Sequence, residues 1–237
     1  AAAGNSVEDI RNICDFAHLY GARVYVTLNT ILYDDELSEA EKMVGQLYEA
    51  GVDALITQDL ALLKMNLPPI ALHASTQMDT CTPEKAQFLE RAGYSQIVVA
   101  RELSLRQLRA ISSAVSVPIE GFVHGALCVS YSGRCYVSQH CFGRSANRGC
   151  CAQFCRLNFD LVDANGKVLS TGHQLSMRDM NRTESIEDML DAGVSSFKIE
   201  GRLKDINYVR NVTAHYRRQI DAIIERRPDE FRRSSFG

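Results

Sequence analysis

Residues 54–76 read ALITQDLALLKMNLPPIALHAST and decide the fold class. Two apolar runs, residues 54–59 and 70–76, are short and continuous, and each ends on polar side chains. A continuous apolar run of this length is typical of a strand in a parallel sheet that is covered on both faces. Because parallel strands end at one edge of their sheet, we expect Gln58, Asp59 and His73 to gather there. The segment therefore predicts an α/β protein.

The same alternation of strand and helix continues on both sides of this segment. Strands are expected at residues 23–29, 54–59, 70–76, 96–102, 119–125 and 195–201, and helices at residues 7–20, 38–50, 83–92, 104–113, 185–191 and 206–226. Polar endings on six successive strands favour a (β/α)8 TIM-like barrel over a doubly wound sheet, whose ligands gather at one switch point. Six strands are fewer than eight, so we expect this chain to lack the first two β/α units of the barrel.

The pattern divides the chain into four expected parts. Residues 1–127 carry barrel β/α units, and residues 128–172 form a cysteine-rich insertion at the rim of the barrel, with a β-hairpin that turns at Asn165-Gly166. Residues 173–226 hold the final barrel unit and a long helix. The charged residues 227–237 are expected to be a mobile tail.

The composition is that of a soluble globular protein, with 46% hydrophobic and 23% charged residues. No apolar run is long enough to span a bilayer, and no signal peptide is visible. Eight cysteines without a secretion signal argue against disulfides and favour a reducing cytoplasm. The net charge of −3 gives no general attraction to nucleic acid, so RNA binding would need a local basic patch. Arg144, Arg148 and Arg156 are the candidates.

Four cysteines are spaced like the ligands of a metal site: Cys128, Cys135, Cys151 and Cys155. Four thiolates are the usual set for a [4Fe–4S] cluster. Zinc is the alternative, but a structural zinc site usually takes two closely spaced cysteine pairs, and only the second pair here is close. The third possibility is that the thiols are incidental, as we expect for Cys141.

Residues 120–138, EGFVHGALCVSYSGRCYVS, closely resemble the signature of the collagenase-like peptidase family U32. The fixed positions of that signature are met by Glu120, Phe122, Gly125, Ala126, Leu127, Cys128, Gly133, Cys135, Val137 and Ser138. Other stretches, such as LHASTQM and FKIEGRLK, also look like segments of this family. The resemblance implies a (β/α)8-like barrel whose first two strands precede the start of this chain.

The resemblance also implies an activity. Better-understood members look like iron–sulfur proteins that hydroxylate RNA bases or a quinone precursor, some of them with prephenate as a co-substrate. The form of the cysteine segment is nearest the RNA-hydroxylase branch and favours ribosomal RNA over tRNA. Two alternatives stay open: a collagenase-like protease, and a non-catalytic iron–sulfur partner in a heterodimer with a paralogue.

Four further residues are candidate catalytic groups: His124, His73, Glu200 and Arg202. His124 ends a strand four residues before Cys128 and is either a proton donor beside the cluster or a structural histidine. Glu200 and Arg202 would hold a carboxylate or phosphate, or else form a pair that braces the barrel. A protease would need a thiol beside a base, for which His124 and Cys128 are the available pair.

Overall fold

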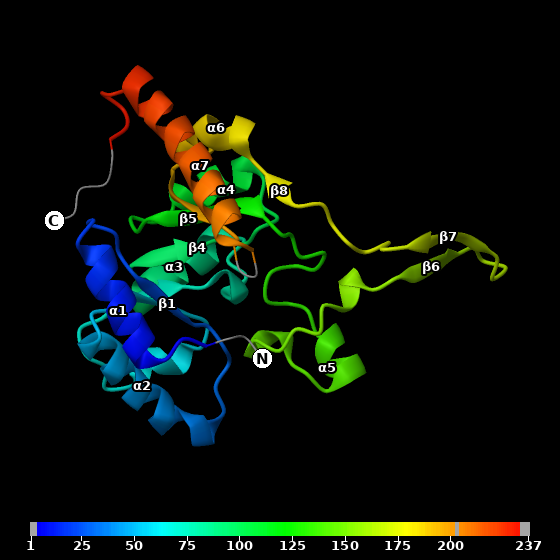
Figure 1. The fold of residues 1–237 in the computed structure, drawn as a ribbon, viewed down its shortest axis with the longest axis horizontal. Helices are drawn as coiled ribbons and strands as arrows, with labels where there is room; N and C mark the ends of the chain where they lie inside the picture. Colours follow the sequence, from blue (N-terminus) through cyan, green and yellow to red (C-terminus); the bar gives the residue numbers. More distant parts are fainter. Residues whose placement is uncertain (1–3, 202–203, 233–237) are drawn as a thin grey trace.

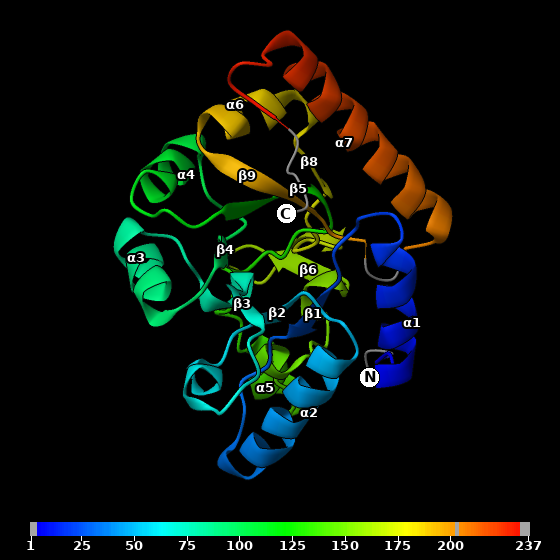
Figure 2. The ribbon, with the colours of Figure 1, turned by 90° about the vertical axis from the view of Figure 1, so that its left-hand side faces the viewer.

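The structure is a computed structural model that describes residues 4–201 and 204–232. Six parallel strands form one sheet in the order β1-β2-β3-β4-β5-β9, and β8 pairs antiparallel with the end of β5. Their bounds are β1 (Tyr25–Leu28), β2 (Ala54–Thr57), β3 (Ala71–Ala74), β4 (Gln96–Val98), β5 (Ile119–Gly125), β8 (Met180–Asn181) and β9 (Val194–Ile199). The sheet curls into a half-barrel (Figure 2), which confirms the predicted barrel class.

Helices cover the convex face of this half-barrel (Figure 2). They are α1 (Val7–His18), α2 (Leu37–Glu49), α3 (Pro83–Ala92), α4 (Leu105–Ser112), α6 (Ile186–Asp191) and α7 (Ile206–Arg226). Among the described helices, none is both long and apolar enough to cross a membrane. Local signals set several ends: Thr82 accepts a hydrogen bond from the Lys85 N–H, Pro83 opens α3, and Gly93 ends it at a φ of 111°.

The helix α2 begins slightly before the predicted range of residues 38–50. A short 3-10 turn, Asp34–Glu36, precedes the helix, and Ser38 lies inside its first turn. The Glu36 carboxylate accepts a hydrogen bond from the Tyr33 N–H at 2.8 Å and thereby closes the turn before α2. The helix therefore starts one residue earlier than expected.

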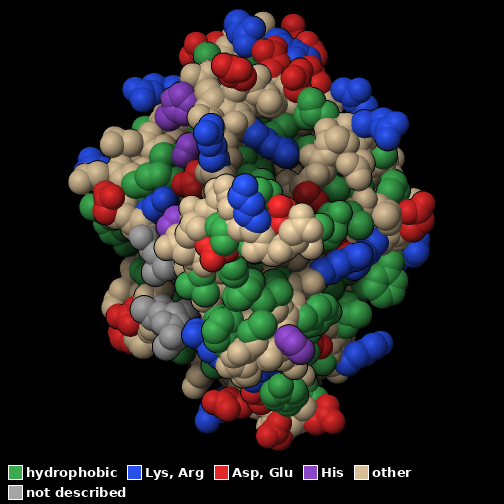
Figure 3. All heavy atoms as spheres, turned by 90° about the vertical axis from the view of Figure 1, so that its right-hand side faces the viewer, with side chains coloured by type: hydrophobic (Ala, Val, Ile, Leu, Met, Phe, Trp, Pro, Cys, Tyr) green, Lys and Arg blue, Asp and Glu red, His purple; other side chains and the backbone are tan. Residues whose placement is uncertain are grey.

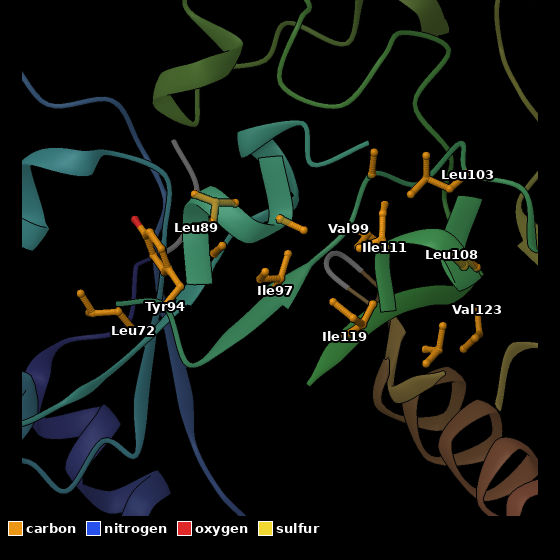
Figure 4. Close-up of a cluster of buried hydrophobic side chains, with 14 of the residues drawn as sticks. Leu72, Leu89, Tyr94, Ile97, Val99, Leu103, Leu108, Ile111, Ile119 and Val123 are labelled. Atoms are coloured by element: carbon orange, nitrogen blue, oxygen red, sulfur yellow. The ribbon is translucent and has the colours of Figure 1, made fainter. Parts of the chain in front are cut away.

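The main hydrophobic core lies between the sheet and the helices. Figure 4 shows Leu89, Ile97, Leu108, Ile111 and Ile119 meeting there, and each is almost fully buried. A side chain of this size contributes about 1.5–3 kcal/mol when it leaves water. Successive strand residues face opposite ways, so Val98 instead joins a smaller cluster with Ile56, Phe122 and Met180. Apolar contacts on both faces explain why the strands read as continuous apolar runs.

The first strand is less buried than its sequence predicts. Along β1, Tyr25 and Thr27 are exposed, and Val26 and Leu28 are half-buried. The reason is its position, since β1 pairs only with β2 among the described strands and forms one edge of the sheet.

The cysteine segment, residues 128–156, leaves the sheet after β5 and contains the short helix α5 (Val137–Phe142). An isolated hairpin follows, made of β6 (Phe159–Val162) and β7 (Val168–Gly172), and it extends away from the half-barrel (Figure 1). Its turn has the predicted position, because the Gly166 N–H donates to the Asp163 carbonyl and Gly166 has a φ of 80°. The predicted hairpin is thus confirmed.

The first residues after α7 are packed against the protein. Arg227 forms ion pairs with Glu187 and Asp191 on α6 and with Glu230, and Phe231 packs against the main core. Only residues 227–232 of the segment that we expected to be mobile are described, and these are docked; residues 233–237 lie outside the described part.

Candidate functional site

The centre of the signature, Ser132-Gly133-Arg134, is fixed to the rim, the edge of the sheet where the parallel strands end. Ser132 is buried and donates from its N–H and its hydroxyl to the two carboxylate oxygens of Glu102, at 3.1 and 3.0 Å. Its oxygen accepts a hydrogen bond from the Arg101 N–H at 3.2 Å. The loop that follows Cys128 is therefore attached to the end of β4.

The next two residues attach the same loop to the end of β3. Gly133 has a φ of 71°, and a Cβ atom there would lie 2.0 Å from the Gln77 carbonyl oxygen. Only glycine fits such a position. Arg134 forms an ion pair with the buried Asp79. Together these contacts fix the backbone immediately before Cys135.

His124 and Glu200, which the sequence places at strand ends, lie next to each other at the ends of β5 and β9. The Glu200 N–H donates to the His124 carbonyl at 2.8 Å. Gly125 has a φ of 107°, and a Cβ atom there would lie 2.4 Å from the Glu200 carbonyl oxygen. This glycine of the signature therefore allows the two strand ends to approach closely. Arg202, the fourth candidate, lies outside the described residues.

The ring of His124 lies in a polar cluster between β5 and α7. Its Nδ1 is 3.2 Å from the Tyr216 hydroxyl, and the two rings meet edge to face. Burial lowers the pKa of His124 below its ordinary 6.5; the Asp179 charge opposes this shift, and His215 and Lys204 reinforce it. The imidazole is therefore neutral at neutral pH and is able to accept a proton.

Charges on two of the predicted cysteine ligands, Cys128 and Cys151, act on a third, Cys155. Burial raises the pKa of the Cys155 thiol; Arg156 opposes the shift, while charge on Cys128 and Cys151 adds to it. The Cys151 sulfur also accepts hydrogen bonds from the Gln153 N–H at 3.4 Å and from the Ser138 hydroxyl at 3.9 Å. Ser138, the last residue of the signature, thus positions the loop that carries Cys151.

The thiols are not gathered into a closed metal site. Cys128 and Cys151 are exposed, Cys135 and Cys155 are half-buried, and all four are free thiols. Across residues 4–201 and 204–232, no three His, Cys, Asp or Glu side chains are arranged to hold a metal ion. The donor atoms suit an iron–sulfur cluster chemically, but the thiols as this structure arranges them do not enclose one.

Two of the three arginines proposed for RNA binding have internal partners instead. Arg148 pairs with Glu36 at 2.5 and 2.8 Å, donates to the Ile31 carbonyl at 2.6 Å and stacks on Tyr33. These contacts tie the cysteine segment to the loop between β1 and α2. The sequence shows that the arginines are crowded together, but it does not show that Glu36, 112 residues away, neutralises one of them.

Arg156 is likewise a structural contact. It donates to the Leu127 carbonyl at 2.7 Å and to Ser176 at 2.6 Å, and so joins the start of the cysteine segment to the chain after the hairpin. Arg144 is exposed. Of the three arginines of the predicted basic patch, Arg144 is the one whose guanidinium has no partner within residues 4–201 and 204–232.

His73 does not lie at the rim. It sits within β3 beside Gln96, is 5% exposed, and burial lowers its pKa; the Glu120 charge opposes that shift, and the Lys198 and Arg23 charges add to it. The prediction of a rim histidine is therefore wrong in position: His73 is level with Gln96, the first residue of β4, and the polar rim begins two residues later, at Ser75.

A buried polar network inside the half-barrel was not predicted. Glu120 is 6% exposed and accepts hydrogen bonds from Gln96 at 2.6 Å, Ser196 at 2.9 Å and the Lys198 ammonium at 2.9 Å. A carboxylate is normally excluded from the middle of an apolar strand, which is the signal that could have identified Glu120. As the first residue of the signature, it anchors β5 to β4 and β9.

Comparison with known proteins gives consistent matches. The model of peptidase family U32 matches residues 1–235. The 23S rRNA 5-hydroxycytidine C2501 synthase of Escherichia coli is 57% identical over 234 residues, which are 98% of this chain and 36% of that protein. The tRNA hydroxylation protein P1 of Bacillus subtilis is 36% identical over 92% of this chain and 54% of its own length. A collagenase of Porphyromonas gingivalis is 34% identical over 95% of this chain and 58% of its own length.

The chain thus spans between about a third and three fifths of these relatives. Among solved structures, the U32 peptidase Mk0906 is 22% identical, with a TM-score of 0.45 over 51% of this chain and 53% of that chain.

Proposed function

The chain belongs to peptidase family U32, and from this premise we propose that it takes part in hydroxylating an RNA base, with a cytidine of ribosomal RNA as the first candidate. The observation that carries the proposal is that one rim holds both His124 and Glu200, at the ends of β5 and β9, and the cysteine loop, which is docked on the ends of β3 and β4. Supporting it, the E. coli relative named for 5-hydroxycytidine synthesis is similar over 98% of the chain. A cytoplasmic location would accompany this activity.

A [4Fe–4S] cluster held by Cys128, Cys135, Cys151 and Cys155 is part of the proposal. Its support is the set of four sulfur donors in one segment and the charge interaction that links Cys155 to two of the others. When bound, such a cluster supplies a redox centre or an open iron coordination site. Prephenate as a co-substrate rests on the family resemblance alone.

The residues of this chain would handle protons and positioning. The neutral imidazole of His124 would accept and return a proton at Nε2, since its Nδ1 already faces Tyr216. Glu200 would face the same site, because its backbone is hydrogen-bonded to His124. Arg202 would bind a carboxylate or phosphate if it lies at the same strand end.

The RNA contact would differ from the basic patch that the sequence predicted. Figure 3 looks onto the hairpin end of the molecule, where Lys and Arg side chains are spread around hydrophobic ones rather than concentrated in one patch. Arg144 is the open cation of the cysteine segment. We propose that the RNA is held mainly by stacking and by scattered charge, with Arg144 as one contact.

The two alternatives differ in their support. A protease is favoured by the relatives named collagenase, but among the described contacts the His124 ring pairs with Tyr216 rather than with a thiol. A partner subunit is favoured by the presence of both a P1 and a P2 tRNA hydroxylation protein in B. subtilis. If the chain is a partner subunit, a paralogue should co-purify with it as a heterodimer.

The experiment is to express the protein in E. coli cells that lack their own 5-hydroxycytidine synthase. Mass spectrometry of 23S rRNA should then show 5-hydroxycytidine, and the anaerobically purified protein should carry about four irons per chain. Cys135→Ser should abolish both signals, whereas Cys141→Ser, a neighbouring exposed thiol, should keep both. Restored hydroxylation by an iron-free protein would refute the cluster, and no hydroxylation by an iron-loaded protein would refute the RNA substrate.

A further inference from the structure

The hydroxyl of Tyr216 lies at the centre of the polar cluster behind His124. Tyr216 comes from the middle of α7 and is 2% exposed. Its oxygen is 2.9 Å from the Val123 carbonyl, 3.2 Å from Asn181 Oδ1 and 3.2 Å from His124 Nδ1. A phenol has a single proton to donate, so it serves only one of these three atoms fully.

The competing acceptors decide where that proton goes. The Val123 and Asn181 oxygens only accept hydrogen bonds, and the Val123 carbonyl is the nearest of the three atoms. If His124 Nδ1 were unprotonated, the Tyr216 hydroxyl would face three acceptors with one proton. If Nδ1 carries a proton, it donates to the Tyr216 oxygen, and the tyrosine donates to Val123. The Arg182 N–H also donates to the Val123 carbonyl, and Thr183 donates to Asn181 Oδ1, so both oxygens have a partner in either arrangement. Only the second arrangement places a proton in the shortest contact, that between the Tyr216 and Val123 oxygens at 2.9 Å, where two lone pairs would otherwise face each other.

From this geometry we infer that Tyr216 is a positioning residue, which holds neutral His124 in the tautomer protonated at Nδ1 and leaves Nε2 as the basic nitrogen. Free histidine in water favours the opposite tautomer, so the protein must impose this one. The inference rests on the proposed role of His124 and deepens it. A proton taken by Nε2 gives an imidazolium that still donates from Nδ1 to Tyr216, so the ring keeps its orientation through the proton transfer.

The remaining neighbours of the ring leave this assignment in place. Asp179, Lys204 and His215 are the charged or titratable groups whose charges act on His124, and the ring of Tyr208 lies 5.9 Å away. Within the described residues, Tyr216 is the hydrogen-bond partner of the His124 ring. Burial lowers the pKa of His124, so the ring is neutral at neutral pH. A neutral ring has one N–H, and the tautomer states which nitrogen carries it.

The test is to read the tautomer directly by two-bond ¹H–¹⁵N correlation spectra of the histidine-labelled chain. His124 is assigned by the signal that disappears in His124→Gln. We expect the wild-type ring to show a protonated Nδ1 and an unprotonated Nε2, and Tyr216→Phe to shift the ring toward the Nε2-protonated tautomer. A wild-type ring protonated at Nε2 would overturn the inference, even if the variant failed to fold.

A matched control is Thr183→Val. Thr183 lies 3.4 Å from the same tyrosine oxygen and donates to Asn181 at 2.7 Å, and none of its hydrogen bonds among the described residues goes to His124. This variant should keep the wild-type tautomer. A tautomer change as large as that of Tyr216→Phe would show that the whole cluster, and not the tyrosine, holds the ring. Because the spectra need no substrate, failure of the proposed hydroxylation would leave this result readable.

Discussion

Replacing Gly133 by alanine should detach the signature loop from the rim. The new Cβ atom would lie 2.0 Å from the Gln77 carbonyl oxygen, a distance that no contact between these atoms tolerates. Gly143 provides the matched control, since it has a similar φ of 61° in the same segment but nothing within 4 Å of its Cβ position. The two variants therefore share the backbone penalty and differ only in the collision.

The magnitudes follow from this difference. A non-glycine residue in the left-handed region costs about 1–2 kcal/mol, so Gly143→Ala should lower the free energy of unfolding by about that amount. In Gly133→Ala the loop must also move away from Gln77, which breaks the two hydrogen bonds from Ser132 to Glu102. At about 1 kcal/mol each, these losses bring the total to about 3–4 kcal/mol.

Urea unfolding of the wild type and both variants measures the free energies, and alkylation of the half-buried Cys135 measures whether the loop is attached. Gly133→Ala should have the lower midpoint and the faster alkylation of Cys135. Equal midpoints and equal alkylation rates in the two variants would refute the reasoning, because the collision with Gln77 would then have no consequence.

Three further predictions concern buried and paired charges. Arg148→Gln should remove an acid-sensitive contribution to stability: its hydrogen bonds lower the pKa of Glu36 from 4.5 to about 2, so the contribution is present above pH 4.5 and lost as the pH falls toward 2. The gap in urea midpoint between wild type and variant should shrink across that window, and a constant gap would contradict the pairing. Glu120→Ala should cost about 2 kcal/mol in urea unfolding, since it leaves the partly exposed Lys198 ammonium unpaired, and Glu120→Gln should cost less; equal costs would argue against the ion pair. Burial lowers the pKa of His73 below 6.5, so folding favours its neutral form and stability falls as the pH drops below 6.5. His73→Gln should therefore reduce the loss of stability between about pH 7 and pH 5.5. An unchanged loss would show that the buried histidine is not responsible.

The sequence predicts those parts of the fold that have local signals. Residues 119–125 and 206–226 were expected as a strand and a helix, and β5 and α7 have these bounds. By contrast, β8 is a two-residue strand whose formation depends on pairing with β5, and its own residues carry no strand pattern. The exposure of β1 also depends on its neighbours in the sheet rather than on its composition.

The sequence also predicts part of the candidate site, namely the residues that lie at strand ends. Strand ends place His124 and Glu200 together because the carboxyl ends of parallel strands share one edge. The partners of a long side chain are not encoded nearby, however. Arg148 was expected to bind RNA at the surface, but its partner in the structure is Glu36, which lies 112 residues earlier in the sequence. Residue type and spacing identify the chemical groups, and only the fold shows which of them are already paired.

The anchoring of the cysteine segment has an entropic consequence. A residue adjoining each proposed thiol has a fixed partner: Leu127 and Arg156 bond to one another, Arg134 pairs with Asp79, and the Ala152 N–H donates to Ser138. Restricting a backbone residue costs about 1–2 kcal/mol, and folding has already met that cost at these positions. A ligand that draws the four thiols together would therefore order side chains and short linkers rather than a free loop, which raises its affinity by preorganisation.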